Sequence, residues 1–394
     1  AVLIQIAGGG LLHARRETRL FPCTPQHEFC PLLRLVGSLQ LDVPRARALV
    51  LQHGWNATAY QIVNPGIQHW FSGGGDAVVG FVRRHRVRIV AGAPVCALDR
   101  LEAVVAEWEQ DAAQAGDRAC YFGAAGRVQS LLSNNPAYST VVLGAQPVWQ
   151  PGQWAQIINS HASLRAQLKR ARNKGVTVVE WPPQRANGHP QLCRCLAEWL
   201  ETRGLPPLHF LVEPETLNRL EGRRIFVAER EGHAVGFVVT SPVPRRNGWL
   251  TEQFVRARHA PNGTVELMID TAVRALAAHG ADYVTMGLVP LSEHAAVPPH
   301  YNPLWLRLFL AWVRAHGRRF YNFGGLDAFK SKFRPQEWEP IFAISNEPRF
   351  SPRSLYAIAA AFSGRSPLLA VARGLIKALE QEYRWLRARF GSKD

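Results

Sequence analysis

The residues best suited to chemistry lie in the segment 320–340, FYNFGGLDAFKSKFRPQEWEP, which mixes cations with aromatic side chains. Its cations occupy alternate positions: Lys330, Lys332 and Arg334. If this run is extended, the three cations share one side, and Phe329 and Phe333 lie on the other. A cationic row backed by an apolar wall can bind a phosphate or stabilise a developing oxyanion. The simpler interpretation is a basic edge that discourages pairing with another strand.

A second group of polar side chains follows the apolar run DYVTMGL (282–288), which is typical of a buried strand. Ser292 and His294 lie a few residues beyond this run. Polar groups at the end of a strand can face a site, so His294 is a candidate general base. A loop histidine that is merely exposed is the alternative.

The turn HAPNGT (259–264) precedes a helix-like pattern that carries two acids. Its last residues, which could direct free N–H groups at an anion, are Asn262, Gly263 and Thr264. An ordinary turn with an N-cap is equally compatible with these residues. Glu266 and Asp270 are four residues apart, and Arg274 is four further on. A solvated stripe with an Asp–Arg pair is the alternative to a catalytic role for either acid.

The elements that must position these groups occur in one order twice. The first half contains two Val-rich runs, a helical pattern and another run: DAVVGFV, VRIVAG, Leu101 to Ala112, and ACYFGA. The second half contains three strand-like runs, a glycine turn, a helix and a strand: RRIFVAER, HAVGFVVTSPV, WLTEQFVR, HAPNGT, Val265 to Leu276, and DYVTMGL. This is the order of the GNAT acyltransferase fold. We therefore predict an α/β (α+β) protein of tandem GNAT-like units, with mixed, mostly antiparallel sheets flanked by helices.

A basic segment, SLRAQLKRARNKGVTVVEW (163–181), lies between the two repeats. Leu164, Leu168 and Ala171 form a narrow apolar stripe that predicts a helix. Its cations, with no acid among them, are Arg165, Lys169, Arg170, Arg172 and Lys174. Like charges at this density repel one another, and bound phosphates would offset the repulsion. A solvated helix face is the alternative.

The composition points to an anionic partner. The 394 residues include 46 Lys and Arg against 30 Asp and Glu, which gives a net charge of +16 and favours binding to nucleic acid or anionic lipid. The six cysteines form no C-x-x-C pair, so we expect no metal site. The chain has no G-x-S-x-G, H-E-x-x-H, P-loop or G-x-G-x-x-G motif, which argues against serine hydrolases, zinc proteases, kinases and dinucleotide enzymes.

The chain begins with AVLIQIAGGGLLHARR, which is apolar to Leu12 and then basic. This pattern is typical of the end of a membrane-spanning helix followed by cytoplasmic arginines, although a stray N-terminal strand or helix would also fit. The predicted organisation has four parts: residues 1–20 as the tail of a membrane segment, 21–160 as the first GNAT-like unit, 161–180 as a basic linker helix, and 181–394 as the second unit with C-terminal helices.

Five motifs together resemble one family: the segment 320–340, MGLVPLS, GTVEL, SLRAQLKRARNKGVTV and HGWNATAYQIVNPG. They resemble the cytosolic catalytic domain of the multiple peptide resistance factor family, the aminoacyl-phosphatidylglycerol synthases, from about Arg45 to Phe350. The resemblance implies transfer of an aminoacyl group, usually lysyl or alanyl, from aminoacyl-tRNA to a phosphatidylglycerol hydroxyl at the cytoplasmic membrane face. It also implies an N-terminal transmembrane domain and a role in antimicrobial peptide resistance. No cofactor is needed, because the tRNA ester is already activated.

The residues and the resemblance together suggest roles for individual side chains. The predicted catalytic residues are Glu266, Ser292, Lys330 and Lys332, which match the family's motifs, and His294 as a candidate base. The cations of the basic segment 163–181 are the predicted tRNA-binding residues. The predicted substrate-binding residues are Gly263, Thr264, Tyr321, Asn322 and Arg334. Glu266 stands where the family usually has Asp, and Leu288-Val289 replaces Met-Ala. These departures leave open another acceptor, such as a different lipid or a peptidoglycan precursor, and an inactive tRNA- or lipid-binding module.

Overall fold

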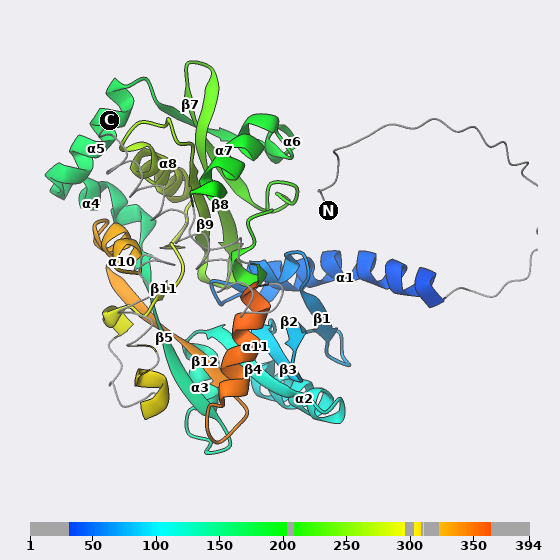
Figure 1. Ribbon diagram of the computed structural model, residues 1–394. Helices are drawn as coiled ribbons and strands as arrows, with labels where there is room; N and C mark the ends of the chain where they lie inside the picture. Colours follow the sequence, from blue (N-terminus) through cyan, green and yellow to red (C-terminus); the bar gives the residue numbers. More distant parts are fainter. Residues whose placement is uncertain (1–30, 203–208, 296–302, 309, 311–322, 364–394) are drawn as a thin grey trace, which may run out of the picture. The chain divides into compact units, whose positions relative to one another are not determined.

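A computed structural model describes residues 31–202, 209–295, 303–308, 310 and 323–363 (Figure 1). Internal contacts divide the chain into residues 1–41 and 42–394, and the features below belong to the second unit. The predicted membrane tail at 1–20, Tyr321, Asn322 and the chain beyond 363 lie outside the described residues. Within the described helices, no stretch is both long and apolar enough to span a bilayer.

The first half of this unit has the predicted order of strands and helix. The elements are β1 (Gln68–Phe71), β2 (Val78–Arg84), β3 (Val87–Ala91), α2 (Leu101–Gln114) and β4 (Arg118–Ala124). β1, β2 and β3 pair antiparallel, whereas β4 runs parallel to β3 after the α2 crossover. The apolar stripe of α2, which includes the fully buried Trp108, lies in one core cluster with side chains of this sheet. Helical periodicity in the sequence thus predicted this helix correctly.

The second half repeats the order with longer strands. Its elements are β6 (Thr177–Trp181), β7 (Arg224–Arg230), β8 (His233–Val243), β9 (Gly248–Arg256), α8 (Thr264–Ala278) and β10 (Tyr283–Thr285). β6 to β9 pair antiparallel, and β10 runs parallel to β9. The turn between β7 and β8 places Glu231 and Gly232 at positive φ, as a two-residue hairpin turn requires.

The two halves exchange strands at the centre of the molecule. The exchanged elements are β5 (Ser139–Trp149), β11 (Val289–Pro290) and β12 (Glu337–Ser345). β5 comes from the first half but pairs with β10 of the second, and β12 comes from the second half but pairs with β4 of the first. β5 and β12 also pair with each other. One 12-stranded sheet results, in the order β1-β2-β3-β4-β12-β5-β10-β9-β8-β7-β6, with β11 on β5. The predicted mixed, mostly antiparallel fold is confirmed.

Helices flank this sheet. Besides α2 and α8, the helices with described bounds are α1 (Pro31–His53), α3 (Gly126–Leu132), α4 (Trp154–Ser160), α5 (Ala162–Asn173), α6 (Pro183–Ala186), α7 (Pro190–Glu201), α10 (Phe323–Ser331) and α11 (Pro352–Ser363). Short 3₁₀ turns cover Ala59–Val63, Leu98–Arg100, Pro151–Gln153, Phe210–Val212, Pro244–Arg246 and Glu293–Ala295. α5 packs beside α8 in the second half, and α10 lies near β11 (Figure 1).

Candidate active site

The run from Phe329 to Arg334 is not extended, so the prediction of a one-sided cationic row was wrong. α10 continues to Ser331, and Phe329 and Phe333 meet four residues apart with their ring centroids separated by 5.5 Å. Phe333 also stacks on Trp154 at 5.7 Å. This aromatic packing favours a helical turn, because residues four apart lie on one face of a helix. Residues two apart in a helix differ by about 200° in direction, so Lys330 and Lys332 cannot share a side.

Lys330 is buried, with 3% of its surface exposed. Its Nζ donates to the backbone oxygens of Met286, Gly287 and Leu288 at 2.6, 2.9 and 3.2 Å. These oxygens follow β10, which pairs with β9 over only three residues before the two strands separate. Burial lowers the pKa of Lys330 to about 7. Lys330 therefore supplies hydrogen bonds to carbonyls near the point where the strands diverge.

Lys332 has a different environment, because its Nζ forms an ion pair with Glu266 Oε1. Nζ also lies 4.2 Å from the centroid of the Phe329 ring and 5.3 Å from that of Phe333. Glu266 stands in the first turn of α8. The Lys332 side chain keeps 27% of its surface exposed, so its cation can still be approached by a ligand. Of the three predicted cations, Lys332 is the one that is both held in place and accessible.

Asp327 gathers several polar groups and was missed by the sequence analysis. Its Oδ2 accepts a hydrogen bond from Ser292 Oγ at 3.1 Å, and its Oδ1 accepts one from Ser331 Oγ at 3.0 Å. His294 Nε2 lies 3.4 Å from Oδ1, and the His294 backbone N–H donates to Ser292 Oγ at 3.2 Å. The His294 ring stacks on Trp338 with a centroid separation of 4.3 Å. This group, Ser292, His294, Asp327, Ser331 and Trp338, is called the histidine cluster below.

The histidine cluster has the geometry of a held acid–base group. A carboxylate beside one ring nitrogen fixes the orientation of an imidazole, and the stacked indole of Trp338 restrains the plane of the ring. The side chain of His294 remains 46% exposed, so it can reach a substrate. Asp327 lies in the segment 320–340, three residues before Lys330. Its position near the predicted cations was the sequence feature that could have marked it as a candidate site residue.

The turn before α8 serves mainly to pack two helices together. Gly263 has φ +93°, and a Cβ at this position would stand 2.2 Å from the backbone oxygen of Gln167 in α5. Thr264 is fully buried, and its hydroxyl donates to the Pro261 oxygen at 2.7 Å. Glycine is therefore required for the close approach of α5. The side chain of Thr264 does not face solvent.

The predicted basic helix forms as α5. Leu164, Leu168 and Ala171 are buried, as their spacing predicted. All five predicted cations are exposed, namely Arg165, Lys169, Arg170, Arg172 and Lys174. Arg172 differs from the other four in having a carboxylate partner, because its guanidinium lies 3.4 Å from the carboxylate of Asp270. α5 thus presents basic side chains on one face and packs on α8 with another.

Asp270 is not part of a solvated stripe, although the Asp270–Arg274 pair of that alternative does form. It is 1% exposed. Its carboxylate accepts hydrogen bonds from Arg274 Nε at 2.8 Å and Trp154 Nε1 at 3.1 Å, in addition to the Arg172 contact. Asp270 therefore ties α8 to α4 and α5, and a buried carboxylate with three donors is a structural anchor.

Arg334 does not join Lys332. It is exposed, has φ +48° and donates its backbone N–H to the Ser331 oxygen in the turn after α10. Within the described ranges, no group of three or more His, Cys, Asp or Glu side chains is arranged to hold a metal ion. The groups able to act on a substrate are therefore those around α10: the histidine cluster and the Lys332–Glu266 pair.

Comparison with known proteins identifies a family whose members resemble this chain. The family model described as "Phosphatidylglycerol lysyltransferase, C-terminal" matches residues 47–345. A phosphatidylglycerol lysyltransferase from Bacillus subtilis (strain 168) is 25% identical over 300 residues, which are 75% of this chain and 34% of that protein. The chain thus spans about a third of the length of this relative.

Two solved structures share the fold. The C-terminal domain of a putative lysylphosphatidylglycerol synthetase from Agrobacterium fabrum has a TM-score of 0.69 at 21% identity, covering 82% of this chain and 97% of that one. L-PGS from Bacillus licheniformis has a TM-score of 0.67 at 20% identity, covering 84% and 97%. At these identities, the likeness concerns the fold.

Proposed function

Because the chain belongs to the family of phosphatidylglycerol lysyltransferase C-terminal domains, we propose that it transfers an aminoacyl group from aminoacyl-tRNA to a hydroxyl of phosphatidylglycerol. The donor, the acceptor and a site of action at the cytoplasmic membrane face are all parts of this proposal. The observation that carries it is the histidine cluster, in which Asp327 and Trp338 hold an exposed imidazole. Ester-to-ester transfer needs such an acid–base group and no further activation of the donor.

The aminoacyl group passes directly from the tRNA to the lipid by addition and elimination, without a covalent bond to the protein. His294 accepts the proton of the lipid hydroxyl while that oxygen attacks the ester carbonyl of the aminoacyl-tRNA. The carbonyl becomes a tetrahedral oxyanion, which the accessible ammonium of Lys332 stabilises. When the intermediate collapses, the carbon–oxygen bond to the tRNA ribose breaks and the ribose oxygen takes the proton back from His294. A new ester bond replaces the old one, so the step needs no cofactor.

The remaining residues position these two groups. Glu266 holds Lys332 over the ring of Phe329 and is assigned a positioning role. Lys330 binds the carbonyls of residues 286–288 and so restrains the start of the segment that carries Ser292 and His294. The predicted catalytic roles of Lys330 and Ser292 thus become support for the reacting groups.

α5 provides the proposed contact with tRNA. Its exposed cations can bind phosphates, and its packing against Gly263 places it next to the first turn of α8, which carries Glu266. The acceptor end of a tRNA bound to α5 would therefore lie close enough to reach Lys332.

Transfer is tested with radiolabelled aminoacyl-tRNAs incubated with the protein, phosphatidylglycerol vesicles and a peptidoglycan precursor. Label extracted with the lipid supports the proposal. Label in the precursor would show the alternative acceptor, and label that remains on tRNA, with tRNA bound to the protein, would show a binding module. Running several charged tRNAs in parallel identifies the amino acid.

A further inference from the structure

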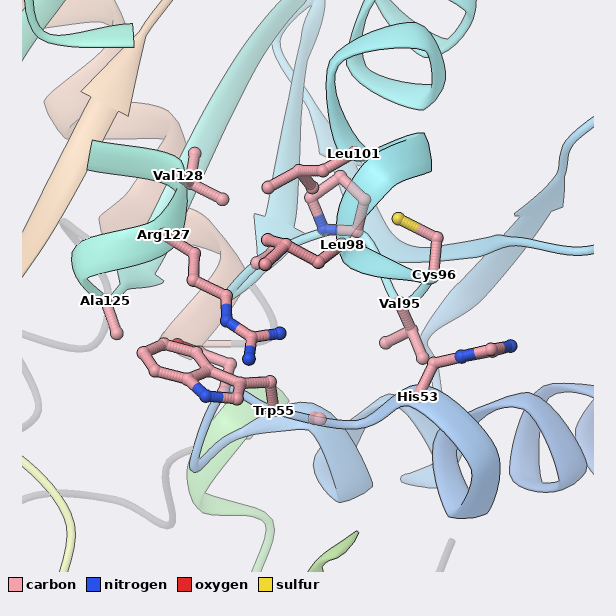
Figure 2. A pocket seen from close by; sticks show the side chains of 13 residues that line it. His53, Trp55, Val95, Cys96, Leu98, Leu101, Ala125, Arg127 and Val128 are labelled. Atoms are coloured by element: carbon pink, nitrogen blue, oxygen red, sulfur yellow. The ribbon is translucent and has the colours of Figure 1, made fainter. Parts of the chain in front are cut away.

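The first half contains two adjoining hollows lined by segments that follow β3 and β4: a small one, drawn in Figure 2, and an open one of about 560 Å³. His53, Leu98, Arg127 and Arg245 line it, and Trp55 lines the adjoining space. In the second half, the segments after the equivalent strands β9 and β10 carry the Glu266 and His294 sites. The hollow thus occupies the position in the first repeat that the candidate active site occupies in the second. These five residues define what we call the arginine cavity.

Cations without an acidic partner gather at the arginine cavity. The Arg127 guanidinium lies 4.3 Å from the centroid of the Trp55 ring, and Figure 2 shows it beside that indole. Neither Arg127 nor Arg245 has a carboxylate partner in the part of the chain that the structure describes. Burial, then the charges of Arg245 and Arg246, lower the pKa of Arg127. Arginines that repel one another without a counter-charge are suited to an anion, because a guanidinium can donate two parallel hydrogen bonds to a phosphate.

The rest of the lining is mainly apolar. Leu98 is 60% exposed, and buried Cys96 also lines the cavity. Asp99 is the carboxylate of the lining, and it is exposed. A polynucleotide has phosphates but no alkyl groups to cover Leu98, and the open basic face of α5 suits it better. An amphiphile with one phosphate satisfies both the arginines and the apolar wall.

We propose that the arginine cavity binds the headgroup of an anionic phospholipid, with its phosphodiester on Arg127 and Arg245 and its acyl-glycerol part against Leu98 and Trp55. The site contains none of the groups assigned to aminoacyl transfer. It would hold lipid whether or not transfer occurs, so its test requires no tRNA. Failure of one proposal therefore leaves the other standing.

Binding is measured by calorimetry with dihexanoyl-phosphatidylglycerol below its micellar concentration. We expect saturable binding, weakened roughly 10- to 100-fold by Arg127→Gln, because a charge-assisted hydrogen bond is lost. Arg256→Gln, which changes an exposed arginine at the end of β9, is the matched control and should bind like the wild type. Thermal melts establish that each variant is folded.

Four outcomes would overturn the inference. Equal binding by wild type and a folded Arg127→Gln variant would show that the cavity does not hold the phosphate. Loss of binding in Lys332→Ala but not in Arg127→Gln would place the lipid at the candidate active site. If glycerol 3-phosphate binds as tightly as the short-chain lipid, the ligand is a free phosphate. If only the binding of a short RNA depends on Arg127, the ligand is a nucleic acid.

Discussion

Lys330 and Lys332 are separated by a single residue, yet their ammonium groups have opposite environments. Lys330 Nζ is buried against three backbone oxygens after β10, whereas Lys332 Nζ pairs with Glu266 and stays partly exposed. Replacing each of these two lysines, which look equivalent in the sequence, should therefore affect a different property of the protein.

Replacing Lys332 should affect turnover and leave folding intact. Lys332→Ala removes the accessible cation, and loss of one oxyanion donor typically costs about 10²–10³ in rate. The measurement is transfer of radiolabel from aminoacyl-tRNA to lipid, with tRNA binding and the thermal melt as controls. Turnover near the wild-type rate would show that the Lys332–Glu266 pair has only a structural role.

Replacing Lys330 should affect stability first. Lys330→Met keeps the length of the side chain but leaves three carbonyls without their donor, so we expect the free energy of unfolding to fall by about 2–5 kcal/mol. Chemical denaturation measures this change. Arg256→Met, at an exposed position, should change it by less than about 0.5 kcal/mol. A Lys330 variant as stable as the wild type would contradict this assignment.

The stability contributed by Lys330 should depend on pH. Burial lowers its pKa in the folded protein to about 7, against the ordinary value of 10.5. Between pH 7 and pH 10.5 the unfolded chain binds more protons than the folded protein, so the free energy of unfolding increases as the pH is raised through this window. Below about pH 7 the lysine is protonated in both states, and this dependence on pH disappears. The difference between wild type and Lys330→Met should change by up to about 1.4 kcal/mol per pH unit. A flat difference would mean that the three carbonyls keep the ammonium protonated.

The histidine cluster should control proton transfer. His294→Ala should reduce turnover by roughly 10²–10⁴-fold, the usual contribution of a general acid–base group. Asp327→Asn should reduce turnover in the same direction, because the imidazole loses the carboxylate that orients it. His233→Ala, at an exposed position at the start of β8, is the control and should transfer normally. Normal turnover in His294→Ala would shift the search for the base to Glu266.

Binding of tRNA should depend on the exposed cations of α5. The triple variant Lys169→Ala, Arg170→Ala and Lys174→Ala should bind tRNA more weakly, and the slope of log affinity against log salt should flatten by roughly one per lost contact. Arg172→Ala should leave this slope unchanged, because Arg172 pairs with Asp270. If the single change alters the slope as much as the triple change, α5 does not bind phosphates in this way.

The local features of this protein could be predicted from the sequence alone. The 3.6-residue spacing of Leu164, Leu168 and Ala171 predicted α5, and the repeated strand–helix order predicted two similar halves. Such patterns are set by which side chains lie within one or two turns of each other, so a short window contains the information. The quoted motifs also pointed to the family.

Only the tertiary structure decided which distant groups meet. The exchange of β5 and β12, the contact of Ser292 and His294 with Asp327, and the gathering of His53, Arg127 and Arg245 join residues far apart in the chain. The helical turn at Lys330 was itself misjudged, because alternate spacing predicts a shared side only for an extended chain. The packing of Phe333 on Trp154 and the hydrogen bonds from Lys330 to the carbonyls after β10 favour the helical turn. Both sets of contacts join residues far apart in the sequence, so a short window does not contain them.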